Sequence, residues 1–141
     1  MFGFNKKKSP DEVSKLILER IYGVLAFPRQ HNNGVLPDSL IDSGYVIGFH
    51  MALLESLYIT FTGDVNIKYP QDWSLVQIKV LTKVLGLNPT ELMNRTLPLI
   101  ENPSPELNSG AADGQEAFRN INNNDNNAFL KFNSNIKNLY Q

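Results

Sequence analysis

The chain has 141 residues, of which 42% are hydrophobic and 10% aromatic, a length and composition that suit one domain with a real core. Its formal net charge of −1 argues against a protein whose main role is to coat nucleic acid, because such proteins usually carry a basic surplus. The sequence contains no cysteine, which excludes disulfides, thiolate metal sites and cysteine nucleophiles and favours a reducing compartment such as the cytoplasm.

The chain begins with a short tail, residues 1–8, in which Phe2 and Phe4 precede three lysines. Aromatic rings followed by lysines can hold a segment on a membrane surface, where each lysine near anionic lipid contributes about 1 kcal/mol. A short terminal segment is more often solvated. We therefore expect a flexible tail rather than a membrane contact.

A first helix is predicted to begin after Ser9. Ser9 can cap the first turn, and Glu12 completes a capping box. The apolar face of this helix continues to Leu25. Pro28 is expected to stop the helix before a polar loop over residues 30–34.

A second helix is predicted over residues 38–62, and it is apolar nearly all round, which is typical of a helix surrounded by others. Small residues recur in it every fourth position and fall on one helical face. They form a shallow groove in which another helix backbone can pack closely, and the first helix is one candidate. This helix-packing stripe consists of Gly44, Gly48, Ala52 and Ser56.

The same segment is the best membrane candidate, because residues 45–61 reach the minimum spanning length of about 17 residues. His50 and Glu55 lie near its middle, and a central carboxylate costs roughly 2.5–3.5 kcal/mol on insertion scales. We therefore expect a buried helix of a soluble protein.

Two further helices are predicted in the middle of the chain. Residues 63–70 are expected to form a loop, and a third helix follows over about residues 71–85. Asn88 repeats the capping pattern of the first helix and opens a fourth helix, which is expected to end at about Leu97, before Pro98.

The composition changes after residue 101. Residues 102–105 contain two prolines and are predicted to be a linker. Residues 120–127 are nearly pure asparagine and are flanked by two modest helices, predicted over 111–120 and 128–140. The last helix has an apolar seam that must dock on this chain's core or on a partner. This candidate partner seam consists of Phe129, Phe132, Ile136 and Leu139.

Residues 76–95 resemble a helix-turn-helix unit. Gly86 lies in the turn, and the apolar residues Leu81, Leu85 and Leu92 lie on the expected inner faces. In that family the second helix enters the major groove of DNA with its N-terminal residues facing the bases. The resemblance implies nucleic-acid contacts through Lys79, Lys83, Thr90, Asn94 and Arg95.

The segment also departs from the family pattern. Thr82 stands where a small alanine usually allows the helices to cross, and Glu91 would face phosphate with the wrong charge. Arg95 is the one basic residue on the second helix. DNA binding is therefore an alternative function rather than the preferred one.

A second alternative is an enzyme or metal site that uses His50 and Glu55, with Asp42 and His31 as further ligands. The two central residues are five positions apart, so they face different sides of an ideal helix. The chain has no His-Glu-x-x-His motif, nucleophile elbow, Walker loop or dinucleotide glycine pattern. We therefore expect no catalytic residue, metal or cofactor.

The sequence predicts an all-α fold, a compact orthogonal bundle of five or six helices around the helix at 38–62. Residues 9–101 are expected to form the core domain, and the helices of 102–141 to pack on it or on a partner. For function we expect a non-enzymatic protein-protein interaction module of the adaptor, accessory or inhibitor type. It would bind a partner protein or a second copy of itself.

Overall fold

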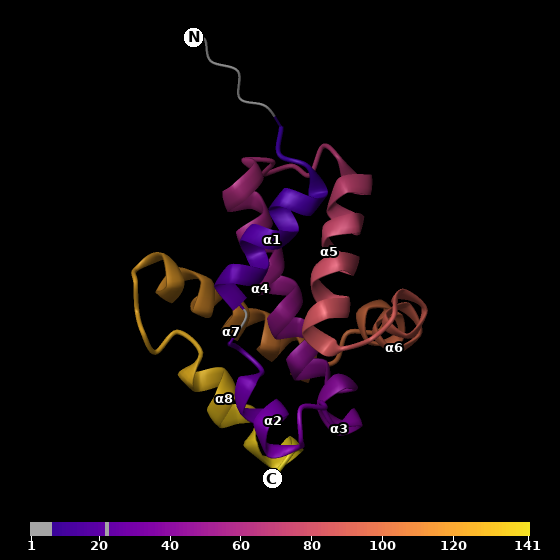
Figure 1. Ribbon diagram of the computed structural model, residues 1–141, viewed down its shortest axis with the longest axis vertical. Coiled ribbons are helices and arrows are strands. Elements are labelled where there is room, and N and C mark those ends of the chain that lie inside the picture. The colour runs from indigo at the N-terminus through magenta and orange to yellow at the C-terminus, as the bar shows by residue number, and fades with distance from the viewer. Residues whose placement is uncertain (1–6, 22) are drawn as a thin grey trace.

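The computed structural model describes residues 7–21 and 23–141, and over these residues the chain contains helices and no strand (Figure 1). This confirms the all-α fold, a bundle built around the predicted central helix, α4 (Gly44–Thr62), although the described residues form eight α-helices rather than the expected five or six. The other helices of the described residues are α1 (Pro10–Ile21), α2 (Ala26–His31), α3 (Asp38–Ile41), α5 (Pro70–Leu85), α6 (Pro89–Glu101), α7 (Pro105–Asn122), α8 (Leu130–Ile136) and the short 3-10 helix η1 (Lys137–Leu139).

The first helix ends earlier than predicted, and Pro28 does not stop it. α1 ends at Ile21, and Pro28 lies in the first turn of the separate helix α2. A proline is tolerated there because the N–H groups of a first turn have no acceptor within the helix. The start of α1 is as expected, with the N–H of Glu12 donating to the Ser9 hydroxyl.

The predicted helix at 38–62 is divided in two at residues 42 and 43. α3 ends at Ile41, and the side chain of Ser43 caps α4 by accepting a hydrogen bond from the N–H of Val46. Serine favours such caps because its hydroxyl competes with the backbone for hydrogen bonds. At the other end, Gly63 adopts a left-handed conformation with φ 71° and terminates the helix as predicted.

α6 continues beyond the predicted end at Leu97 and reaches Glu101, with Pro98 inside it. Proline removes one helical hydrogen bond, the one to the carbonyl of Asn94. Both Asn94 and Pro98 are exposed, so water can satisfy this carbonyl and the helix persists.

α7 is longer than the helix predicted at 111–120, and part of the predicted linker belongs to it. It begins at Pro105, behind the cap residue Ser104, and includes Gly110 and Gly114. Glycine disfavours helix interiors by roughly 1 kcal/mol. Here both glycines are buried against α4, and this tertiary contact outweighs the local preference.

The small residues of α4 receive a neighbouring helix, as predicted, and this helix is α7 rather than the first helix, which was one candidate. A Cβ atom at Gly48 would overlap the carbonyl oxygen of Leu107, and one at Gly110 would overlap the carbonyl oxygen of Tyr45. The two helix backbones therefore touch with no side chain between them. Ala52 extends this contact to Gly114, whose Cβ position lies 3.2 Å from the Cβ of Ala52.

α4 is enclosed by the rest of the bundle, with α1 and α5 along it and α7 behind it in the view of Figure 1. By length and mean hydropathy it is the one described helix that could cross a membrane. Half of its apolar window is nevertheless buried within this chain. It is therefore placed as the core helix of a globular fold. Its fully buried side chains include Ile47, Phe49, Leu53 and Leu54.

Candidate functional site

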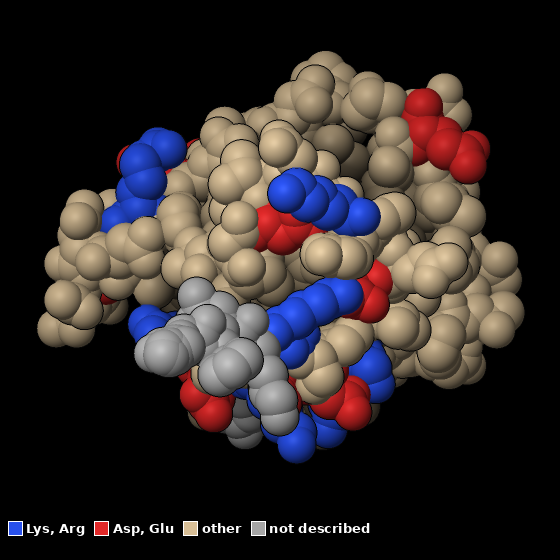
Figure 2. Space-filling model, turned by 90° about the horizontal axis from the view of Figure 1, so that it is seen from above, with Lys and Arg blue, Asp and Glu red and all other residues tan. Residues whose placement is uncertain are grey.

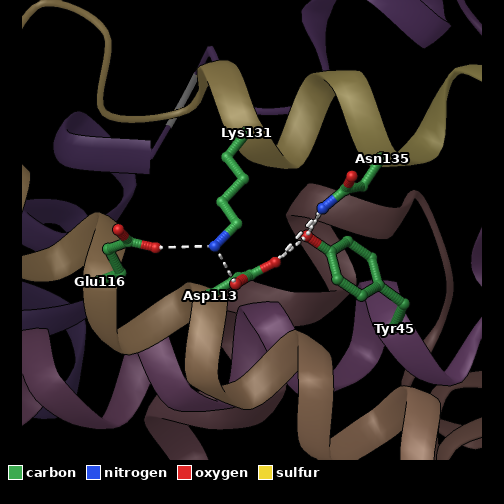
Figure 3. Close-up of polar contacts among 5 residues, drawn as sticks. All are labelled: Tyr45, Asp113, Glu116, Lys131 and Asn135. Carbon is green, nitrogen blue, oxygen red and sulfur yellow. Dashed lines mark hydrogen bonds and ion pairs between the residues drawn. The ribbon is translucent and has the colours of Figure 1, made fainter.

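Three helices bring together a cluster of polar side chains in which Asp113 is the central acceptor (Figure 3). The Tyr45 hydroxyl donates to Asp113 Oδ2 at 2.6 Å, and the Asn135 amide donates to the Tyr45 oxygen at 3.0 Å. Lys131 Nζ lies 3.1 Å from Asp113 Oδ1 and 3.1 Å from Glu116 Oε2. The cluster therefore ties α8 to α4 and α7.

The electrostatics of this cluster favour a structural clamp. Burial and the hydrogen bond to Asp113 raise the pKa of Tyr45 above that of a free tyrosine, so its hydroxyl stays protonated and keeps donating. The carboxylates of Asp113 and Glu116 raise the pKa of Lys131, which stays charged. The hydroxyl, ammonium and Asp113 carboxylate all have partners within the cluster. No sequence motif predicts this cluster, because its members come from three separate helices.

The structure separates the two residues of the predicted enzyme alternative. His50 is 1% exposed, and its Nδ1 lies 2.8 Å from the carbonyl oxygen of Val46, while Glu55 is exposed. The ring of His50 packs edge-on against Phe49 and Phe132. These contacts place His50 in the core, on a different side of α4 from Glu55.

Burial makes His50 a source of acid sensitivity. It lowers the pKa of His50 from 6.5 to about 4, with a smaller contribution from the charge of Arg29. Between these two values the unfolded chain binds a proton that the folded chain does not bind. Stability is therefore retained above pH 6.5 and lost as the pH falls toward 4.

We expect acidification from pH 7 to pH 4.5 to destabilise the wild-type protein by about 2–3 kcal/mol more than the variant His50→Leu. The measurement is the free energy of unfolding in urea at both pH values. The matched control is His31→Gln, because His31 is the other histidine and is exposed. Equal pH dependence in wild type and His50→Leu would contradict the buried neutral imidazole.

The predicted helix-turn-helix segment forms α5, a turn at Gly86 and α6, with Leu81, Leu85 and Leu92 buried as expected. Two of its five predicted nucleic-acid contacts are already paired within the chain. Lys79 Nζ lies 2.7 Å from Asp11, and Arg95 bonds to Asp42 at 2.8 Å and Asp38 at 3.0 Å. The remaining three, Lys83, Thr90 and Asn94, are exposed.

The apolar seam of the last helix docks on this chain's own core. Phe132 and Ile136 are 1% and 0% exposed, and Phe129 and Leu139 are half-buried. The ring of Phe132 stacks on Phe49 with 4.0 Å between centroids. The sequence left open whether the seam docks on this chain's core or on a partner, and the structure shows that it docks on the core.

An exposed apolar stripe on α6 was missed by sequence reasoning. Met93, Leu97 and Ile100 are spaced like one helical face and are 42%, 39% and 41% exposed. The neighbouring face of α6 supplies Leu92 and Thr96 to the core. The spacing was visible in the sequence, but ending the helix at Leu97 removed Ile100 from the pattern.

The remaining predictions concern metals and the N-terminal tail. Among the described residues, no group of three or more His, Cys, Asp or Glu side chains could hold a metal ion. The predicted tail lies mostly outside the described residues, which begin at Lys7. Lys7 forms an ion pair with Asp72, and the ammonium of Lys8 donates to the carbonyl of Phe61.

Comparison of the chain with protein-family models, with curated protein sequences and with solved structures gave no match.

Proposed function

We propose that this protein is a non-enzymatic interaction module that binds a partner protein through the exposed apolar face of α6. The observation that carries the proposal is the stripe of Met93, Leu97 and Ile100, each about two-fifths exposed on one face of a regular helix. Contiguous apolar side chains on a surface are typical of interaction sites. In Figure 1, α6 stands at the side of the bundle, where a partner has access to it.

The charges around the stripe favour a partner with basic residues beside its apolar face. Exposed carboxylates lie at both ends of α6, on Glu91 and on Glu101, and Glu106 follows in α7. The nearest guanidinium, that of Arg95, is already bound to two aspartates. At the right-hand edge of Figure 2, on the side where α6 lies, the visible charged groups are carboxylates. Complementary charge of this kind steers association and fixes its register.

An amphipathic helix that carries lysine or arginine beside its apolar residues fits these features, because such helices bind with anchors spaced like those of α6. The absence of cysteine is compatible with a reducing compartment, and we propose the cytoplasm.

We expect Leu97→Asp to abolish partner binding while leaving the melting temperature nearly unchanged. Leu97 is exposed, and substitutions at exposed positions usually change stability by no more than about 0.5 kcal/mol. The measurement is purification of the tagged protein from its native cells, followed by mass spectrometry of the proteins that accompany it. Sedimentation of the purified chain distinguishes a second copy from a different partner.

The control is Val65→Asp, which places the same charge on a residue that is 69% exposed in the loop before α5. It should retain any partner that Leu97→Asp loses. If Leu97→Asp still binds the partner, the partner does not bind through the α6 surface. If both variants lose the partner, the loss comes from the added negative charge alone.

A further inference from the structure

A second surface feature lies at the other end of the chain's core helix. The start of α1, the end of α4 and the start of α5 enclose a pocket of about 450 Å³. Its walls include the aromatic rings of Tyr58, Phe61 and Tyr69 and the carboxylates of Asp64 and Asp72. Figure 2 looks onto this end of the molecule, where basic and acidic side chains are intermixed. No residue of α6 lines this pocket, so its chemistry does not depend on the proposed function.

The ammonium group of Lys7 lies in this pocket. Its Nζ is 2.7 Å from Asp72 Oδ2 and 3.5 Å from the centre of the Tyr69 ring. A carboxylate beside the face of an aromatic ring is the arrangement that recognises ammonium groups, since both attract a compact cation. The pocket therefore already binds an ammonium group, that of Lys7 of the same chain.

The second carboxylate of the pocket has unused capacity. Asp64 Oδ1 accepts a hydrogen bond from the N–H of Lys68 at 2.8 Å. Asp64 Oδ2 is buried and has no hydrogen-bond partner among the described residues. A buried acceptor without a partner is costly, and a donor brought in by a ligand would relieve that cost.

We propose that this pocket binds a primary ammonium group of another molecule and that Lys7 occupies it within the chain until such a ligand displaces it. Displacement is feasible because the Lys7 side chain is 54% exposed, and exposed ion pairs and cation–π contacts are individually weak. A lysine of a partner segment and a free polyamine present the same chemistry, so the test includes both.

The experiment follows amide chemical shifts of the ¹⁵N-labelled full chain during titration with Nα-acetyl-lysine-N-methylamide. The variant Lys7→Ala should bind this probe about three- to thirtyfold more tightly than wild type, because the competing ammonium has been removed. Adding Asp72→Asn to Lys7→Ala should abolish that gain. The shifts should centre on the loop at 63–69 and on the first turn of α5.

Two control variants show whether a change in probe affinity comes from vacating the pocket or from the change in net charge. Lys15→Ala removes one exposed positive charge from α1 without vacating the pocket, and Asp11→Asn removes a carboxylate that pairs with Lys79 instead. The first should leave probe affinity at the wild-type value. The second, combined with Lys7→Ala, should keep the full gain.

Three results would overturn the proposal: equal affinity of wild type and Lys7→Ala, equal binding of the uncharged analogue Nα-acetyl-norleucine-N-methylamide, or a gain in affinity that persists when Asp72→Asn is added to Lys7→Ala. If the site is present, tighter binding of tetralysine than of spermidine assigns it to protein segments. The reverse order assigns it to free polyamines.

Discussion

Replacing Gly48 with alanine is expected to lower the free energy of unfolding by about 3 kcal/mol, and with it the melting temperature by about 10 °C. Inside an ordinary helix the same change stabilises by roughly 0.5–1 kcal/mol. The sign is reversed here because the new Cβ atom would overlap the backbone carbonyl of Leu107 on α7. A backbone cannot rotate away as a side chain can, so the two helices must move apart.

A series of glycine variants makes this prediction specific. Gly110→Ala should cost as much as Gly48→Ala, because its Cβ would overlap the carbonyl of Tyr45 from the opposite side. Gly44→Ala should cost less, since its Cβ would lie 3.1 Å from the hydroxyl of Ser104, a milder contact than overlap with a backbone carbonyl. Gly23→Ala is the control, with no atom within 4 Å of its Cβ. Thermal unfolding of the four variants gives the order, and a Gly48→Ala protein as stable as Gly23→Ala would contradict the close crossing.

The same crossing shows what sequence reasoning could and could not reach. The period of four in Gly44, Gly48, Ala52 and Ser56 predicted a close helix contact, and the structure has one at the first three of these residues. The partner was missed because the helix predicted at 111–120 began after Gly110, so Gly110 and Gly114 were not recognised as a second pair of small residues four positions apart. The contact itself is between two backbones far apart in the sequence, and local helix propensity carries no information about it.

Two of the other errors at helix ends involve proline. Pro28 and Pro98 were both expected to mark a boundary, but Pro28 lies in a first turn and Pro98 removes a bond to an exposed carbonyl. The second error also hid the exposed stripe on α6. The pairing of Lys7 with Asp72 was out of reach for a different reason, because the two residues are far apart in the sequence and no short motif joins them.

The docking of α8 is the second contact on which the bundle depends. Lys131 and Asn135 of α8 make polar contacts with α7 and α4, and Phe132 of the same helix packs in the core. The hydrogen bonds specify the orientation of α8, while the apolar contact supplies most of the free energy, because a net hydrogen bond contributes only about 1 kcal/mol. The apolar contact is therefore the one whose removal is expected to matter most.

Phe132→Ala is expected to destabilise the protein by about 3–5 kcal/mol, the usual cost of truncating a buried aromatic side chain. Phe132 is 1% exposed and stacks on Phe49 of the central helix, so its loss leaves a cavity beside α4. Urea unfolding followed by circular dichroism measures this change. The matched control is Leu130→Ala on the same helix, because Leu130 is 64% exposed and its truncation should change stability by no more than about 0.5 kcal/mol.

The fluorescence of Trp73 decides whether α8 is part of one cooperative unit. It is the only tryptophan of the chain, and it packs on Tyr58, far along α4 from the contact of Phe132 with Phe49. If the fold is one unit, Phe132→Ala should shift the fluorescence and circular dichroism transitions to lower urea by the same amount, because coincident transitions mark two-state unfolding.

A fluorescence transition left at its wild-type midpoint would mean that α8 detaches alone. The seam would then be free to bind a partner, and the assignment of Phe132 to a permanent core would fail.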